Sequence, residues 1–93
     1  MSGKFMSSRL VRRVPATYPE AAKLKKIEGT VALEIIVGTN GSVEQIEVLS
    51  GQRILAQAAM DAVRQWKYEP TYIKGLPVRV LTRVDVLFHW NSN

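Results

Sequence analysis

The 93-residue chain contains no cysteine, a single histidine and no long hydrophobic run. The lack of cysteine excludes disulfides, thiolate nucleophiles and sulfur-ligated zinc. No stretch approaches the roughly 18 apolar residues of a membrane-spanning helix, and the start "MSGKFMSSRL" lacks the apolar centre of a signal peptide. The length predicts one domain with one modest core.

The charge balance is basic but not concentrated. Thirteen Lys and Arg against eight Asp and Glu give a net charge of +5, which is compatible with nucleic acid, an anionic membrane or an acidic protein as partner. The basic residues are scattered, which is typical of an ordinary soluble surface. A sheet that binds RNA carries aromatic side chains on its central strands, and residues 30–37, the expected central strand, have none. We therefore expect no nucleic-acid partner.

The residues that could support catalysis are few and badly placed. His89 has Asp85 on the same predicted strand but no serine nearby, so a nucleophile–base–acid triad is not indicated. Glu34, Glu44 and Glu47 fit solubilising surface charge better than paired acid–base groups. We expect no catalytic residue, no cofactor and no metal ion, and hence no enzyme.

The first half of the chain predicts a helix and a hairpin. Residues 1–13 are interpreted as a flexible leader or a cloning remnant, and residues 14–93 as the domain. In "TYPEAAKLKK", Thr17 and Glu20 have the spacing of a capping box, and Pro19 suits the first turn of a helix. "TVALEIIV" is apolar on both faces, as in a central strand. Asn40-Gly41 is a strong hairpin signal.

The second half predicts a return strand, a helix and a final strand. The alternation of "SVEQIEVLS" slips between Val43 and Ile46, which indicates a bulge. In "ILAQAAMDAVRQW" the apolar residues recur at helical spacing and form one stripe: Leu55, Ala58, Ala59, Ala62, Val63 and Trp66. Pro70 ends this segment, and "KGLP" makes a turn before a thirteen-residue strand over residues 78–90.

These elements predict an α+β fold with chain order α-β-β-α-β. The helix between the second and third strands makes those two strands parallel, so the simplest arrangement is a three-stranded antiparallel sheet of order 2-1-3 with two helices on one face. The last strand is then an edge strand.

The ordered motifs resemble the C-terminal domain of the TonB family of energy transducers over residues 11–88. The similarity rests on Tyr18-Pro19, Glu28-Gly29, Asn40-Gly41, the helical alanines, Trp66-x-Tyr68-x-Pro70 and Gly75-x-Pro77. It implies a periplasmic domain, tethered to the inner membrane by an N-terminal helix absent from this sequence, that passes proton motive force from an inner-membrane complex to outer-membrane transporters. In this family the transporter's TonB box adds as a strand beside the last strand of the domain.

The resemblance places the partner-binding residues on the last strand. They are Arg79, Val80, Leu81, Thr82, Arg83, Val84, Asp85, Val86 and Leu87, with Arg12, Arg13 and Tyr18 as possible secondary contacts. A second copy of the chain could pair with the same edge and give a homodimer, which Trp90 would favour if it packs on that copy. The alternative function is therefore a self-associating interaction domain of a sensor-like membrane protein.

The length of the last strand also points to an open edge. The hairpin strands are shorter, so we expect part of residues 78–90 to stay unpaired and available for strand addition. Six backbone hydrogen bonds at a net ~1 kcal/mol each are matched by an ordering cost of ~1–2 kcal/mol per peptide residue. Side-chain contacts then decide the affinity, which predicts weak, micromolar binding.

Overall fold

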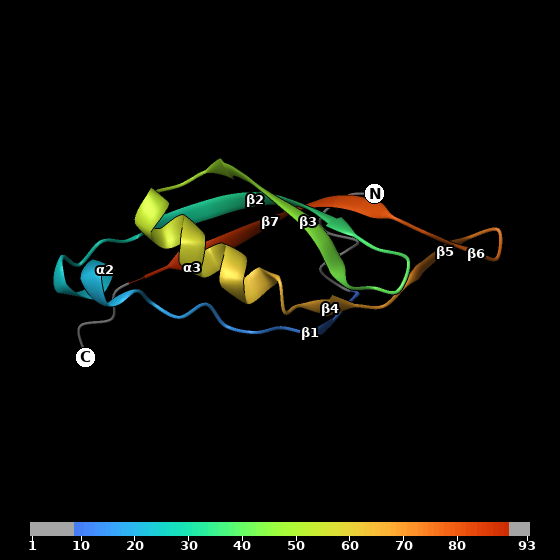
Figure 1. The fold of residues 1–93 in the computed structure, drawn as a ribbon, viewed down its shortest axis with the longest axis horizontal. Helices are drawn as coiled ribbons and strands as arrows, with labels where there is room; N and C mark the ends of the chain where they lie inside the picture. The colour runs from blue at the N-terminus through green and yellow to red at the C-terminus, as the bar shows by residue number, and fades with distance from the viewer. Residues whose placement is uncertain (1–8, 90–93) are drawn as a thin grey trace.

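The computed structural model of the chain describes residues 9–89. The elements follow one another as β1 (Leu10–Arg12), α2 (Glu20–Leu24), β2 (Gly29–Val37), β3 (Val43–Ser50), α3 (Arg53–Val63), β4 (Lys67–Tyr68), β5 (Thr71–Ile73), β6 (Leu76–Val78) and β7 (Val80–Phe88). Figure 1 shows α3 lying across the central sheet, β1 and β4 side by side along one margin, and the β5–β6 hairpin projecting from one end.

The central sheet has the order β3-β2-β7, and both outer strands are antiparallel to β2. This confirms the α+β fold and the predicted order 2-1-3. Helix α3 connects β3 to the later strands and covers the sheet, so β3 and β7 run parallel to each other, as expected from the crossover.

The hairpin between β2 and β3 is as predicted, although its turn differs. Gly41 has a φ of 87°, whereas Asn40 does not adopt a positive φ. The Gly38 amide donates to the Ser42 carbonyl at 2.7 Å, and the Gly41 amide donates to the Gly38 carbonyl at 2.9 Å, so the loop has three residues instead of two. The register moves from Ile36↔Gln45 to Val37↔Val43, and this confirms the predicted bulge.

The core lies between the sheet and α3. The inward side chains of β2 and the apolar stripe of α3 are almost completely buried: Val31, Leu33, Ile35, Val37, Leu55, Ala59 and Val63. The helix ends at Val63, earlier than the predicted residue 66. Trp66 follows a short turn and is still only 7% exposed, so the predicted stripe reaches the core beyond the end of the helix.

The predicted capping box at the first helix is wrong. Helix α2 begins at Glu20 after an extended Pro19, and no side-chain cap hydrogen bond is formed. A residue that precedes proline is disfavoured in the helical region, so the helix begins only after Pro19 and Thr17 lies too early to cap. The Tyr18 hydroxyl instead donates to the carbonyl of Ile27.

The prediction of one strand over residues 78–90 is also wrong. Val78 pairs with Thr71 in the β5–β6 hairpin, Arg79 interrupts the strand, and β7 has nine residues. All nine pair with β2, from Gly29↔Phe88 to Val37↔Val80. An excess of strand length therefore does not explain an open edge, and Trp90 lies outside the described residues.

Two pairs of short strands were not predicted. Strand β1 pairs with β4, and β5 pairs with β6. Strand β1 falls within residues 1–13, the segment interpreted as a leader, and its partner is only two residues long. Elements this short carry too little periodicity to be recognised in a sequence.

Candidate functional site

Strand β7 has one open edge. Within residues 9–89 it is hydrogen bonded to a single neighbour, β2, and lies at the end of the strand order. An edge strand presents a row of unpaired N–H and C=O groups that can template another strand. Topology, not strand length, produces this feature.

The two faces of β7 differ in character. On the inner face, toward α3, Val80, Thr82, Val86 and Phe88 are at most 7% exposed. The outer face consists of the side chains that alternate with them: Leu81, Arg83, Asp85 and Leu87. Leu81 is 54% and Leu87 72% exposed, so a strand added at the edge would find apolar surface at both ends of this face.

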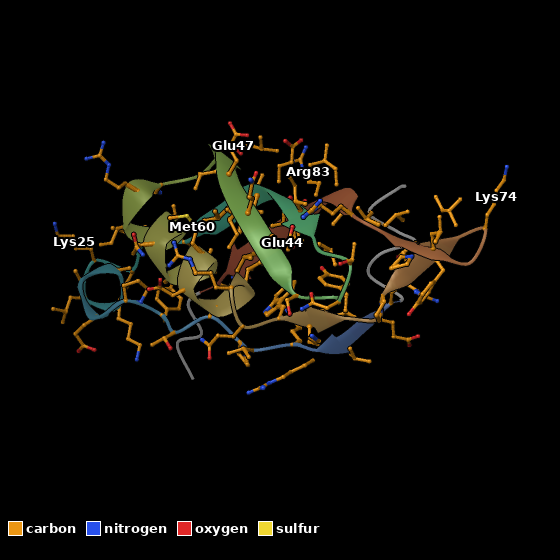
Figure 2. All side chains as sticks on the ribbon, turned by 45° about the vertical axis from the view of Figure 1, so that its right-hand side comes forward. Lys25, Glu44, Glu47, Met60, Lys74 and Arg83 are labelled. Atoms are coloured by element: carbon orange, nitrogen blue, oxygen red, sulfur yellow. The ribbon has the colours of Figure 1, made fainter. Side chains whose placement is uncertain are left out.

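A charge pair lies between these two leucines. The Arg83 Nε atom is 3.2 Å from an Asp85 carboxylate oxygen, and both side chains are more than half exposed. Arg83 and Glu47 project from the same side of the sheet (Figure 2), because both residues pair with Glu34 of β2. An exposed pair of this kind contributes little to stability.

Arg79 is separated from the rest of the predicted partner-binding set. It occupies the break between β6 and β7, and its Nε atom lies 2.8 Å from a carboxylate oxygen of Glu44 in β3. The other eight predicted residues, 80–87, form one continuous stretch of β7.

A hollow of about 280 Å³ borders the open edge of β7. It is lined by Leu10, Arg13, Trp66, Tyr68, Arg83, Val84 and Asp85. Successive side chains of a strand point to opposite faces, so a hollow lined by three consecutive residues of β7 reaches the edge of the strand and is not confined to one face. We call it the edge hollow.

The far wall of the edge hollow is formed by two buried aromatic side chains. Trp66 and Tyr68 are 7% and 2% exposed, and the Trp66 indole nitrogen donates a 2.8 Å hydrogen bond to the Val14 carbonyl. The guanidinium carbon of Arg13 is 5.7 Å from the centre of the Trp66 ring, which is cation–π distance. Burial raises the pKa of the Tyr68 hydroxyl, so this wall stays neutral at physiological pH.

The three predicted secondary contacts have different positions. Arg13 lines the edge hollow. Tyr18 packs edge-to-face on Phe88 at the end of β7, with ring centres 5.6 Å apart. Arg12 pairs with Lys67 in the β1–β4 ladder and does not line the hollow.

The sequence does not predict that Leu10, Trp66 and Tyr68 line a hollow beside β7. The Trp66-x-Tyr68 motif contributes to the family resemblance in the sequence, and both residues are buried. Their position at the edge hollow is evident only in three dimensions, because the hollow lies between segments distant in the sequence. A larger hollow of about 400 Å³ between residues 14–19 and α3 is not lined by β7.

His89 follows the last residue of β7, whereas Glu34 and Glu47 lie side by side within the sheet. His89 lies 3.0 Å from a Glu28 carboxylate oxygen, and Glu34 pairs in register with Glu47. Across residues 9–89, no group of three or more His, Cys, Asp or Glu side chains could hold a metal ion. Within the same range, neither helix has the length and apolar character needed to cross a membrane.

The chain matches a known family model and is similar to curated proteins. Residues 14–90 match the family model described as Gram-negative bacterial TonB protein C-terminal. Protein TonB of Vibrio cholerae is 35% identical over 78 residues, covering 82% of this chain and 32% of that protein. Protein TonB of Xanthomonas campestris is 38% identical over 79 residues, covering 83% and 35%. The chain thus spans about a third of the length of these curated relatives.

Solved structures show the same fold. The solution NMR structure of the Pseudomonas aeruginosa TonB CTD matches with a TM-score of 0.76 at 24% identity, covering 90% of this chain and 87% of that chain. A structure of the tonb2 protein from Vibrio anguillarum matches with a TM-score of 0.67 at 29% identity, covering 88% and 80%.

Proposed function

The chain belongs to the family of Gram-negative bacterial TonB protein C-terminal domains, and on that premise we propose that it is a coupling module that docks on outer-membrane transporters. It binds the TonB-box peptide of a transporter by strand addition and passes on the proton motive force of the inner membrane for active uptake. The observation that carries this proposal is the open edge of β7.

The chemistry of the edge favours a peptide as ligand. Main-chain groups supply affinity in strand addition, and side-chain surfaces supply specificity. Strand β7 has nine residues, and within the described part of the chain its edge opposite β2 is open. Two exposed leucines, Leu81 and Leu87, lie on its outer face. No side chain of the bound peptide needs to react, in keeping with a mechanical role and not a catalytic one.

The proposed link is weak at equilibrium but suited to load. Backbone hydrogen bonds at about 1 kcal/mol each are largely offset by the ~1–2 kcal/mol per residue needed to order the peptide. When the peptide is pulled along β7, several hydrogen bonds are strained together and must break together. A micromolar complex can therefore transmit a brief pull and then dissociate.

The location of the domain follows from the same premise. We place it in the periplasm, between the transporter's exposed peptide and an inner-membrane complex that supplies the proton motive force. The curated relatives are about three times as long as the matched region. In this proposal a membrane helix and a spacer, outside the matched region, connect the domain to the inner membrane.

The same edge supports a second candidate function. A second copy of the chain could pair along β7 and give a two-fold dimer, so the domain could serve as a self-associating interaction domain of a sensor-like membrane protein. Both functions use the same hydrogen-bonding groups. A TonB-box peptide and a second copy therefore compete, and sedimentation at increasing peptide concentration measures that competition.

NMR titration with TonB-box peptides tests the leading proposal. We expect amide shifts to centre on residues 80–88. The matched controls are two versions of one peptide. One is N-methylated at every odd-numbered residue, and the other at every even-numbered residue. Only one set of amides points toward β7 in an added strand, so one version should lose binding and the other should keep it. Shifts outside β7, or equal binding of both versions, would contradict strand addition.

A further inference from the structure

We propose that the edge hollow is a side-chain subsite that selects one large apolar residue of the docked peptide, at the position opposite Val84. This inference rests on strand addition at β7 and adds to it a rule for peptide choice. It follows from the position of the hollow, the chemistry of its walls and its size.

The position of the hollow fixes the peptide residue that enters it. Arg83, Val84 and Asp85 contribute to the lining, so the hollow is centred on Val84 along the strand. Residues directly opposite in paired strands project to the same face. The peptide residue opposite Val84 therefore points to the inner face, where Leu10, Trp66 and Tyr68 form the far wall.

The walls favour an apolar side chain. Three of the lining residues, Leu10, Trp66 and Val84, are apolar, and Tyr68 adds a neutral ring. The charged members already have partners: Arg13 lies over the Trp66 ring, and Arg83 is paired with Asp85. A polar guest would lose water on entry, and the charged side chains that could hydrogen bond to it already interact with one another or with Trp66.

The hollow is large enough to take one side chain of the docked peptide. Its volume of about 280 Å³ falls just below the roughly 300–1,000 Å³ of pockets that take drug-sized ligands. Trp66 and Tyr68 are held by core packing, and the Trp66–Val14 hydrogen bond secures the adjoining segment. The hollow is therefore preformed, and a leucine-sized side chain needs little rearrangement to enter.

The surrounding positions set the register. With one peptide residue opposite Val84, the residues three places away on either side lie opposite Leu81 and Leu87 on the outer face. A complementary peptide thus has a large apolar residue at its centre and smaller apolar residues three places away. The residues between need only strand propensity.

A palindromic probe tests this rule without assuming a strand direction. The probe is the capped peptide Val-Thr-Thr-Xaa-Thr-Thr-Val, with leucine, alanine or asparagine as the central guest. We expect leucine to bind about 10- to 50-fold more tightly than alanine, in line with the additional apolar area buried. Asparagine, which has nearly the shape of leucine, should bind no better than alanine.

A variant of the protein whose hollow is filled by a larger side chain tests the same rule. Leu10→Trp places a bulky ring in the hollow and should remove the preference for leucine over alanine. Val11→Trp is the control, because Val11 is the next residue of β1, is 59% exposed and does not line the hollow. It should leave the preference unchanged.

The outcomes separate the subsite from strand addition itself. Guest-dependent affinity with amide shifts in residues 80–88 supports the subsite. Equal affinity for all three guests, with the same shifts, overturns the subsite and leaves strand addition standing. Absence of shifts in β7 with every guest and with the TonB-box peptides overturns both. The guest series uses the unaltered chain, so the test does not depend on the folding of Leu10→Trp.

Discussion

The indole nitrogen of Trp66 donates a 2.8 Å hydrogen bond to the carbonyl oxygen of Val14. This contact joins the turn after α3 to the segment that leads from β1 to α2, two regions far apart in the sequence. Because Trp66 also lines the edge hollow, one side chain both closes the core and positions a wall of the proposed subsite.

Removing this hydrogen bond should loosen the N-terminal segment. We expect Trp66→Phe to lower the free energy of unfolding by about 2 kcal/mol, since the Val14 carbonyl loses its partner and the smaller ring leaves a void. Urea denaturation followed by far-UV circular dichroism measures the loss. Tyr72→Phe, at a residue 60% exposed, is the control and should change stability little. Equal stabilities for the two variants would contradict the assigned contact.

Gly41 should tolerate no side chain. Its φ is 87°, and an added Cβ would lie 1.9 Å from the Tyr68 carbonyl oxygen. The Tyr68 amide also donates a 2.8 Å hydrogen bond to the Gly41 carbonyl, so the hairpin and β4 cannot move apart freely. We expect Gly41→Ala to cost at least about 3 kcal/mol, which combines the left-handed backbone penalty with a steric clash.

Gly75 provides the comparison for this prediction. It has a similar φ of 82°, but an added Cβ would meet nothing within 4 Å. Gly75→Ala should therefore cost only the backbone penalty of about 1–2 kcal/mol. Urea unfolding curves for both variants measure the difference. Equal losses in the free energy of unfolding would show that the clash with Tyr68 does not add to the cost of Gly41→Ala.

A buried hydroxyl in β7 offers a stabilising substitution. Thr82 is 4% exposed and its hydroxyl has no hydrogen-bond partner within the described residues. Replacing it by valine removes a desolvated polar group while nearly preserving shape, so Thr82→Val should raise the free energy of unfolding by about 1 kcal/mol. Thr30→Val, at an exposed position of β2, should have little effect. A destabilised Thr82→Val protein would indicate that this hydroxyl does have a partner.

The sequence predicted the central elements because their signals are local. Alternation in "TVALEIIV", the turn at Gly41 and the apolar stripe from Leu55 to Val63 each arise from residues close together in the sequence. Together with a short crossover helix they leave few possible topologies. The order of the sheet, and with it the edge position of β7, could therefore be predicted without coordinates.

The remaining features depend on distant contacts. The break at Arg79 arises because Val78 pairs back on Thr71, and a continuous run of strand-forming residues does not indicate where a chain changes partner. The capping-box signal failed because Pro19 determines the start of the helix. The edge hollow could not be predicted, since it requires β1 and β4 to lie beside β7.

The exposed leucines of β7 should contribute to peptide affinity without supporting the fold. Leu87 is 72% exposed and lies opposite Thr30 of β2. We expect Leu87→Thr to keep β propensity and to change the free energy of unfolding by less than about 0.5 kcal/mol. The affinity for a TonB-box peptide should fall about fivefold, because a partly buried apolar contact is lost.

The matched control is Leu76→Thr, at a residue 68% exposed on β6 in the projecting hairpin. This variant should bind the peptide as the unaltered chain does. Isothermal titration of both variants measures the difference, and an unchanged affinity for Leu87→Thr would mean that the backbone edge alone holds the peptide at this end of β7.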